Sequence, residues 1–349
     1  MTENDFNLSC PLPLTDRKTI VLGHGSGGRL SAQLMRDLFL PAFDNEILRK
    51  LDDQAVLTAG SERIAFTTDS FVVTPLFFPG GDIGQLAVNG TVNDLAMSGA
   101  QPLFLSAAFI LEEGFPIDQL RLVTESMAKA ARAAGVTIVT GDTKVVNKGS
   151  ADKLFITTSG IGLLPSGTTI SASLARAGDQ IILSGTIGDH GMAVLSVREG
   201  LEMEGQIASD TAPLHSLVRA MLAAGTIHAL RDPTRGGLAT SLCEIATTAQ
   251  IGVEVRAGAI PVQREVKAAC EILGLDPLFV ANEGKLVAFV PAASAQHVLM
   301  AMRQTPEGRQ ATIIGEAVQS HPGMVLLETE VGGRRILDLP LTEQLPRIC

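Results

Sequence analysis

The stretch DIGQLAVNGTVNDLAMSGA, residues 82–100, decides the fold class because its small and apolar residues recur at helical spacing. The segment before it, RIAFTTDSFVV (63–73), alternates between apolar and polar residues as a strand does. The segment after it, PLFLSAAFIL (102–111), is predicted as a buried strand. A helix between two strands indicates an α/β protein.

The same alternation extends in both directions along the chain. In the first half it predicts a strand at 19–22, helices at 30–39 and 116–135, and strands at 136–145 and 154–164; residues 40–57 are predicted as helical or irregular. In the second half it predicts strands at 180–185, 252–256, 285–290 and 312–314, and helices at 190–200, 211–224, 236–250 and 263–273. We therefore predict four regions: a leader with a glycine-rich loop (1–43), two α/β domains (44–170 and 171–322) and a C-terminal tail (323–349).

Composition excludes several classes of function. The formal net charge is −10 at pH 7 and Trp and Tyr are absent, which argues against nucleic-acid and anionic-membrane surfaces. No apolar run is long enough to cross a membrane, and the acidic N-terminus is not a signal peptide. The four cysteines are widely spaced, which indicates neither a disulfide framework nor a zinc site and predicts a cytoplasmic location.

The loop GHGSGG (23–28) matches the G-x-G-x-x-G pattern of dinucleotide-binding proteins. The helix that follows is not followed by a second parallel strand ending in an acidic residue, so the match is weak. Two interpretations remain: a mobile loop whose N–H groups close over phosphates, or a tight connection between two elements.

Three aspartates occupy unusual positions in the first half. Asp69 ends an apolar strand, Asp94 lies in the small-residue helix, and Asp142 follows a strand with Lys144 two residues on. Carboxylates gathered at one edge of a sheet suit Mg²⁺, which prefers oxygen ligands and brings phosphate oxygens with it. Taken one at a time, these residues also have structural explanations. Asp69 or Asp142 could cap a helix or turn, Asp94 could lie on a solvated polar face, and Lys144 could be an ordinary surface lysine. Taken together, they favour a nucleotide–Mg²⁺ site.

The second half contains three further candidate stretches. RDPTRGG places Asp232 and Arg235 before a helix, where they could hold phosphate or form a plain N-cap. ANEGKLV places Glu283 in a turn before a strand, where its carboxylate could act as a base or simply cap the turn. In GTIGDHG, a lone histidine, His190, is more often structural than functional.

The order of these motifs resembles one family. The motifs that carry the resemblance are, in chain order, GHGSGG, TTDSFVVTPLFFPGGDIG, NGTVNDLAMSGA, FILEEGFP, TGDTKVV, SGTIGDHG, RDPTRGG, ANEGKL and the terminal PRIC. From about residue 20 to its end the chain resembles the HypE family, the carbamoyl dehydratases of NiFe-hydrogenase maturation, within the PurM-like ATP-binding superfamily. The internal motifs are typical of the superfamily, whereas the terminal PRIC is specific to this family.

The resemblance implies a PurM-like two-domain fold whose N-terminal domains form a homodimer with a β-barrel-like interface. It implies ATP and Mg²⁺ as cofactors, with Asp69, Asp94 and Asp142 as metal ligands. The nucleotide-binding residues it implies are Gly25, Gly27, Gly28, Asp69, Asn93, Asp94, Thr140, Asp142, Asp232 and Arg235.

The implied reaction takes place on Cys349. A HypF-type carbamoyltransferase delivers a carbamoyl group to its sulfur, ATP-dependent dehydration converts that group to a thiocyanate, and a HypC–HypD complex accepts the cyanide. Lys144 and Glu283 are the implied catalytic partners of Cys349. The prolines at 340 and 346 oppose a helix in the tail, and nine extended residues reach about 30 Å.

Two alternatives remain from the residues. One is another PurM-like enzyme, such as selenophosphate synthetase, aminoimidazole ribotide synthetase or thiamine-monophosphate kinase; none of these needs a C-terminal cysteine, and GHGSGG lacks the reactive cysteine of the first. The other is a non-catalytic carrier or scaffold with Cys349 as a thiol handle.

Overall fold

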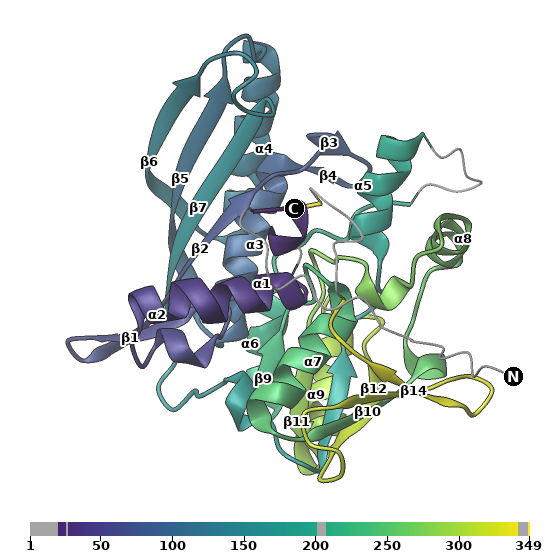
Figure 1. Cartoon of the computed structure of the whole chain (residues 1–349). Helices are drawn as coiled ribbons and strands as arrows, with labels where there is room; N and C mark the ends of the chain where they lie inside the picture. Colours follow the sequence, from purple (N-terminus) through teal and green to yellow (C-terminus); the bar gives the residue numbers. More distant parts are fainter. Residues whose placement is uncertain (1–19, 26, 201–206, 341–347) are drawn as a thin grey trace, which may run out of the picture.

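The computed structural model describes residues 20–25, 27–200, 207–340 and 348–349 (Figure 1). Its N-terminal half contains a five-stranded sheet in the order β1-β2-β7-β5-β6. The strands are β1 (Ala55–Ala59), β2 (Glu62–Phe71), β5 (Gln101–Glu112), β6 (Thr137–Val146) and β7 (Leu154–Leu163). Only β5 and β6 run parallel, and the helix α4 (Ile117–Ala134) provides the crossover that a parallel pair needs.

Two helices, α3 (Ile83–Met97) and α4, cover one face of this sheet (Figure 1). Asp82 caps α3 by accepting hydrogen bonds from the N–H groups of residues 84 and 85. A Cβ at Gly84 would lie 2.5 Å from the Val123 carbonyl oxygen, so the small residue allows α3 to pack closely on α4. This confirms the predicted helix and its small-residue packing face.

The opposite face of the sheet is not covered by a helix (Figure 1). The strand predicted at 102–111 is present as β5, but side chains alternate along it, so it is buried on one side only. Exposed apolar side chains on the uncovered face include Phe66, Phe104, Ile110, Ile161 and Leu163.

The C-terminal half contains a seven-stranded sheet in the order β14-β13-β10-β12-β8-β11-β9, in which only β10 and β13 are parallel neighbours. Its strands are β8 (Asp179–Leu183), β9 (Ala229–Arg231), β10 (Gly252–Arg256), β11 (Val287–Pro291), β12 (Thr312–Val318), β13 (Val325–Glu328) and β14 (Arg334–Leu337). The helix α7 (Gly237–Ala249) packs on one face, and α6 (His215–Ala224) and α9 (Ala292–Arg303) pack on the other. The helices α5 (Asp189–Glu199) and α8 (Arg264–Leu273) form a smaller cluster beside them.

The start of the described chain differs from the prediction. Residues 20–22 form no strand; a 3-10 turn η1 (Leu22–Gly25) leads into α1 (Arg29–Leu34), a π-helical turn η2 (Met35–Phe39), α2 (Leu40–Phe43) and η3 (Leu48–Lys50). The helix predicted at 30–39 is therefore present and longer. The strands β1 and β9 and the helix α9 were not predicted. The sequence beyond His321 predicts a short β-like segment before the proline-bearing tail, and β13 and β14 lie there, inside the range assigned to the tail.

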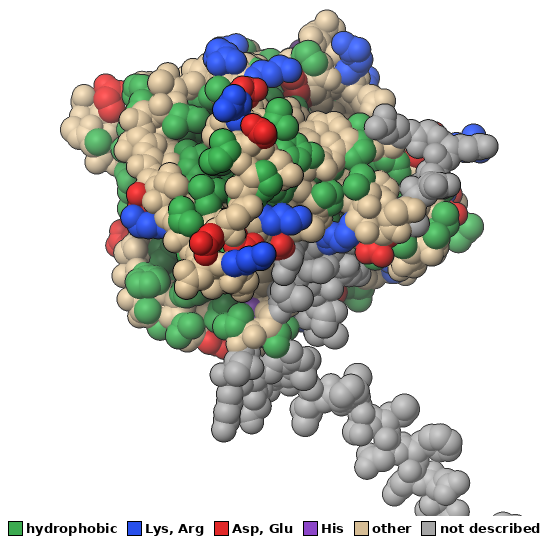
Figure 2. Space-filling view, turned by 90° about the horizontal axis from the view of Figure 1, so that it is seen from above, with side chains coloured by type: hydrophobic (Ala, Val, Ile, Leu, Met, Phe, Trp, Pro, Cys, Tyr) green, Lys and Arg blue, Asp and Glu red, His purple; other side chains and the backbone are tan. Residues whose placement is uncertain are grey.

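The face seen from above carries hydrophobic side chains among interspersed acidic and basic ones (Figure 2). Among the described helices, none is both long and apolar enough to cross a membrane. Cys243 and Cys270 are buried, as predicted for core residues.

Candidate active site

Carboxyl groups from both halves of the chain meet where the two sheets adjoin. Asp69 lies on the helix-covered face of β2, Asp94 lies on α3, and Asp232 directly follows β9. Thr67 Oγ1 donates to Asp94 Oδ2 at 2.7 Å. Asp53, which was not predicted, joins them and accepts a hydrogen bond from Arg231. We call Asp53, Asp69, Asp94 and Asp232 the acid cluster.

The acid cluster holds charges that repel one another. Burial raises the pKa of Asp94 well above its usual value, and the charges of Asp232, Asp69 and Asp53 raise it further. Burial and the charge of Asp53 raise the pKa of Asp232 to about 8. Burial also raises the pKa of Asp69, which the Arg235 guanidinium opposes. Asp94 is thus not on a solvated polar face, and the cluster favours a bound cation.

Glu283 lies against this cluster. Its side chain is only 3% exposed, and within the described residues its Oε1 has no hydrogen-bond partner. Burial raises its pKa well above the usual value, and the charges of Asp69, Asp232 and Asp210 add to the effect. A buried carboxyl with an unpaired oxygen and a raised pKa in a cluster of charged groups is a candidate general base.

The main chain around Glu283 is held from two sides. Its N–H donates to Asp210 Oδ1 at 3.0 Å, and its carbonyl accepts from Asn93 Nδ2 at 3.1 Å. The same Asn93 amide also bonds the Ala212 carbonyl and the Leu214 N–H. Asn93, predicted as a nucleotide contact, therefore joins the two halves of the chain at this site.

The last residue of the chain reaches the same place. The Val72 N–H donates to the Cys349 carbonyl at 2.9 Å, so the terminus lies at the end of β2, close to Asp69. Charge on Cys349 raises the pKa of Arg235, and the charges of Asp69, Glu283 and Asp94 contribute in the same direction. The structure therefore brings Cys349, Arg235 and Glu283 together with the acid cluster.

The glycine-rich loop lies beside Arg235 and the root of the tail. Gly27 has a φ of +76°, and a Cβ there would lie 2.9 Å from the Arg235 carbonyl oxygen. A Cβ at Gly28 would lie 2.4 Å from the Pro340 carbonyl oxygen, and the Arg29 N–H donates to that oxygen at 3.1 Å. At Gly25, by contrast, nothing lies within 4 Å of a built Cβ. This loop thus makes close contacts, and only its first part is open.

Three predicted residues lie elsewhere in the single chain. Thr140, Asp142 and Lys144 pair with Ser106, Ala108 and Ile110 on the uncovered face of the sheet. Lys144 Nζ lies 2.9 Å from Asp142 Oδ2, and this contact lowers the pKa of Asp142. The expectation that Asp142 gathers with Asp69 and Asp94 within one chain is wrong, because Asp69 and Asp142 lie on opposite faces. Their roles in the site remain predictions that need a second copy.

Sequence reasoning missed Asp53, Asp210 and Arg231, and treated His190 as structural. Asp53 is anchored by Arg231, the residue before Asp232, so the basic residue in the RDPTRGG motif was the available signal. No motif marks Asp210.

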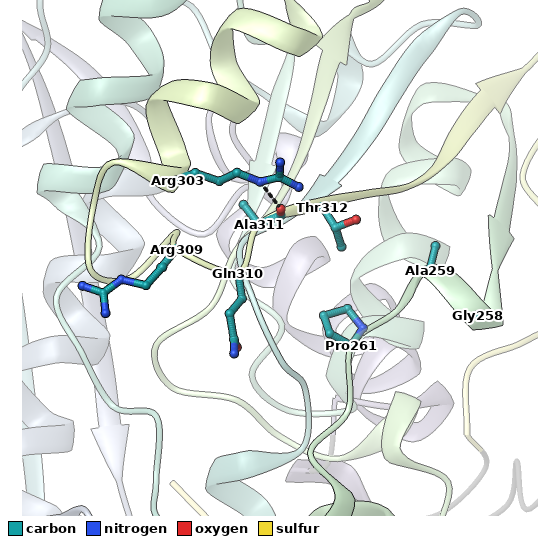
Figure 3. A pocket seen from close by; sticks show the side chains of 8 residues that line it. All are labelled: Gly258, Ala259, Pro261, Arg303, Arg309, Gln310, Ala311 and Thr312. Carbon is teal, nitrogen blue, oxygen red and sulfur yellow. Dashed lines mark hydrogen bonds between the residues drawn. The ribbon is translucent and has the colours of Figure 1, made fainter.

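A shallow pocket of about 340 Å³ lies away from this site (Figure 3). It is lined by the end of α9 and by η5 (Ala257–Ala259), and its Arg303 donates Nε–H to the Ala311 carbonyl at 2.9 Å. None of its lining residues belongs to the acid cluster.

Comparison with known proteins agrees with this architecture. Family models described as AIR synthase related protein, N-terminal and C-terminal domains, match residues 51–164 and 176–326. The chain is 56% identical over 333 residues to the carbamoyl dehydratase HypE of Cupriavidus necator, covering 95% of both chains. It is 48% identical to that of Escherichia coli K12, covering 95% of this chain and 99% of the relative.

Solved structures give the same result. One HypE–HypF complex contains a chain 51% identical to this one, with a TM-score of 0.84, over 88% of this chain and 99% of that one. A hydrogenase maturation protein HypE in complex with ATP is 50% identical, with a TM-score of 0.80, over 95% of this chain and all of that one. These similarities extend over both halves of the chain, and the chain belongs to the HypE family of carbamoyl dehydratases.

Proposed function

We propose that this chain dehydrates a carbamoyl group carried on its own Cys349, using ATP, and so supplies a cyanide ligand for the iron centre of a NiFe hydrogenase. The observation that carries the proposal is the position of the terminus: Cys349 is bonded at the end of β2, beside Arg235 and the acid cluster. A substrate carried on the chain reaches this position without a separate binding step.

The reaction follows from the chemistry of the groups. A thiocarbamate, R–S–C(=O)–NH₂, loses oxygen only when that oxygen becomes a good leaving group. Transfer of the γ-phosphoryl group of ATP to it gives R–S–C(=NH)–O–PO₃²⁻, ADP and a proton. Loss of the remaining N–H proton then expels phosphate and leaves R–S–C≡N.

The chain's own residues fit the roles in these steps. Glu283, with an unpaired buried oxygen and a raised pKa, is our candidate for accepting the N–H protons. Arg235 is a cation next to Cys349 and can offset charge on the oxygen that receives the phosphoryl group. Lys144 is the second predicted catalytic residue, and its exposed position requires that it act from another subunit.

The donor set fits Mg²⁺ bound together with ATP. Among the described residues, no three acidic, histidine or cysteine side chains lie close enough to hold an ion by themselves. Mg²⁺ with nucleotides uses one or two carboxylates and takes its other ligands from phosphates and water. Asp69 and Asp94 would hold it, with Asp142 contributed by a partner. A bound ion would offset the charge of the phosphates.

The remaining nucleotide contacts and the partners belong to the same proposal. Gly25, Gly27, Gly28, Asn93, Thr140, Asp232 and Arg235 are our nucleotide-binding candidates. A homodimer is supported by the exposed apolar side chains on the uncovered face of the N-terminal sheet, which a second copy would bury. It would also bring Asp142 and Lys144 of one copy toward the other.

We propose a HypF-type carbamoyltransferase as donor, supported by the complex of a relative 51% identical, and a HypC–HypD complex as acceptor. The location proposed is the cytoplasm, on the spacing of the cysteines.

Mass spectrometry tests the proposal directly. The protein is carbamoylated on Cys349 by its carbamoyltransferase and then given ATP and Mg²⁺. We expect a water-sized mass loss confined to the C-terminal peptide, absent in Cys349→Ala and unchanged in Cys10→Ala, a matched removal of a thiol. No loss in the wild type, or a loss that persists in Cys349→Ala, would refute the proposal.

A further inference from the structure

His190 lies in the first turn of α5 and is completely buried. Its ring makes two hydrogen bonds: Nε2 lies 2.8 Å from the Ile348 carbonyl oxygen, and Nδ1 lies 2.8 Å from Ser209 Oγ. A carbonyl oxygen only accepts, so Nε2 carries the hydrogen. Burial lowers the pKa of His190, so the ring is neutral and Nδ1 accepts from the Ser209 hydroxyl.

The ring is fixed on its other sides as well. The edge of Phe78 meets it at a centroid distance of 5.4 Å and an interplanar angle of 82°. Ser209 is itself placed, because its N–H donates to the Pro79 carbonyl at 2.8 Å and its Oγ accepts from the Thr211 N–H at 3.2 Å. The tautomer that donates toward Ile348 is therefore set by the surroundings of His190.

The turn that carries His190 is bonded to the segment that carries Glu283. The Gly191 N–H donates to the Ala281 carbonyl at 3.0 Å, and the Gly188 N–H donates to Asn282 Oδ1 at 2.7 Å. His190 thus holds a fixed position relative to Glu283.

The residue that His190 bonds is the one before Cys349. Ile348 is 3% exposed and packs in the apolar cluster under β2 and α3. The next carbonyl, that of Cys349, accepts from the Val72 N–H at 2.9 Å. Two successive carbonyls of the terminus are therefore bonded, one from each half of the chain.

We propose that His190 is a positioning residue of the dehydration, which through its Nε2–H bond to the Ile348 carbonyl holds the terminus with the Cys349 sulfur beside Glu283 and Arg235. This role rests on the proposed function, since it concerns the same site. His190 does not touch the reacting atoms.

Two readouts test this role. The first is the rate at which iodoacetamide alkylates Cys349 in the resting protein, followed on the C-terminal peptide. This readout needs no turnover, so it can succeed or fail independently of the dehydration. The second is the single-turnover rate of water loss from the carbamoylated protein, measured against ATP concentration.

A matched pair of variants isolates the one bond. In His190→Gln the side-chain amide extends to the Nε2 position and can still donate to Ile348, whereas in His190→Asn it reaches only the Nδ1 position and Ser209. His297→Asn, the same change on the exposed side of α9, is the control. Ser209→Ala removes the hydroxyl that sets the tautomer and serves as an independent second variant.

In His190→Asn we expect Cys349 to be alkylated about three- to tenfold faster than in the wild type. The carbamoylated variant should lose water more slowly by a similar factor. The reason is that loss of one hydrogen bond lowers the equilibrium constant for docking of the terminus by about this factor. Half-saturation by ATP should not change. Ser209→Ala should follow the same direction, while His190→Gln and His297→Asn stay near the wild type. Equal alkylation rates in the wild type, His190→Asn and Ser209→Ala, or equal effects of the Gln and Asn variants, would overturn the proposal.

Discussion

Replacing Asp232 by asparagine should make the ligand-free protein more stable at neutral pH. Asp232 is buried beside Asp53 and Asp69, and its pKa is raised to about 8 from the usual 3.8. Between these two values the folded state keeps a proton that the unfolded state has lost. The folded state binds more protons, so stability falls as the pH rises through this window. An asparagine side chain carries no charge, so Asp232→Asn removes this pH-dependent loss of stability.

The size of the effect follows from the shift. Each unit of pKa corresponds to about 1.4 kcal/mol, so the loss between pH 4 and pH 7 has a ceiling of about 4 kcal/mol. The variant keeps a buried polar group, and the other carboxyls of the acid cluster remain. We therefore expect Asp232→Asn to gain about 1–3 kcal/mol at pH 7.5, below the ceiling set by the pKa shift.

Thermal unfolding measured from pH 4.5 to pH 8 provides the assay. The gain should be a melting temperature higher by several degrees at pH 7.5, and it should shrink toward pH 4.5, because the loss of stability accumulates only as the pH rises above the unfolded-state pKa of 3.8. Asp142→Asn is the matched control. Its carboxyl is exposed, and the hydrogen bond from Lys144 lowers its pKa, so this variant should lose stability above the usual carboxyl pKa rather than gain it.

Ligand binding supplies the second half of the test. Mg²⁺ with ATP should stabilise the wild type more than Asp232→Asn, because the cation relieves repulsion that the variant no longer has. A variant that melts lower at pH 7.5, or a gain of equal size at pH 4.5 and pH 7.5, would refute the assignment of Asp232 to a repulsive acid cluster.

The remaining predictions concern the glycine loop and the base. Gly28→Ala should lower the melting temperature because its Cβ would lie 2.4 Å from the Pro340 carbonyl oxygen, whereas Gly25→Ala should not, since nothing lies within 4 Å there; equal melting points would contradict this contact. Glu283→Gln should reduce water loss from the carbamoylated protein by at least about 100-fold, as expected for removal of a general base, while Cys349 still accepts the carbamoyl group. Unchanged water loss, measured by mass spectrometry, would exclude Glu283 as the base.

The sequence predicted elements whose pattern is set locally. The helix over residues 82–100 and the helix ended by Gly135 are present because a cap at Asp82 and a left-handed glycine with φ of +67° fix their ends. Residues 20–22, the described part of the strand expected at 19–22, form no strand, whereas β1, which begins within the stretch expected to be helical or irregular, pairs with β2 as a hairpin. Whether such a short segment forms a strand depends on the strand it pairs with, and the sequence of the segment alone does not specify that partner.

The site could be predicted as a set of residue types but not as a geometry. Asp69 and Asp142 were expected together because each lies on a strand of one sheet. The side-chain alternation of strands places them on opposite faces, and a displacement of one residue in either register would have changed that result. Asp53 and Asp210 reach the site through pairs with Arg231 and the Glu283 N–H, which depend on the packing of the two halves.

The anchors of the terminus constrain how the reaction states can be told apart. Both bonds to the terminus, from His190 to Ile348 and from Val72 to Cys349, use main-chain oxygens, that of Cys349 being a carboxylate oxygen. Neither bond involves the sulfur, so neither bond by itself distinguishes a free thiol from a carbamoyl group or a cyanide carried on it. Discrimination between these forms must therefore come from groups that face the sulfur, and Arg235 and Glu283 carry opposite charges when both are ionised.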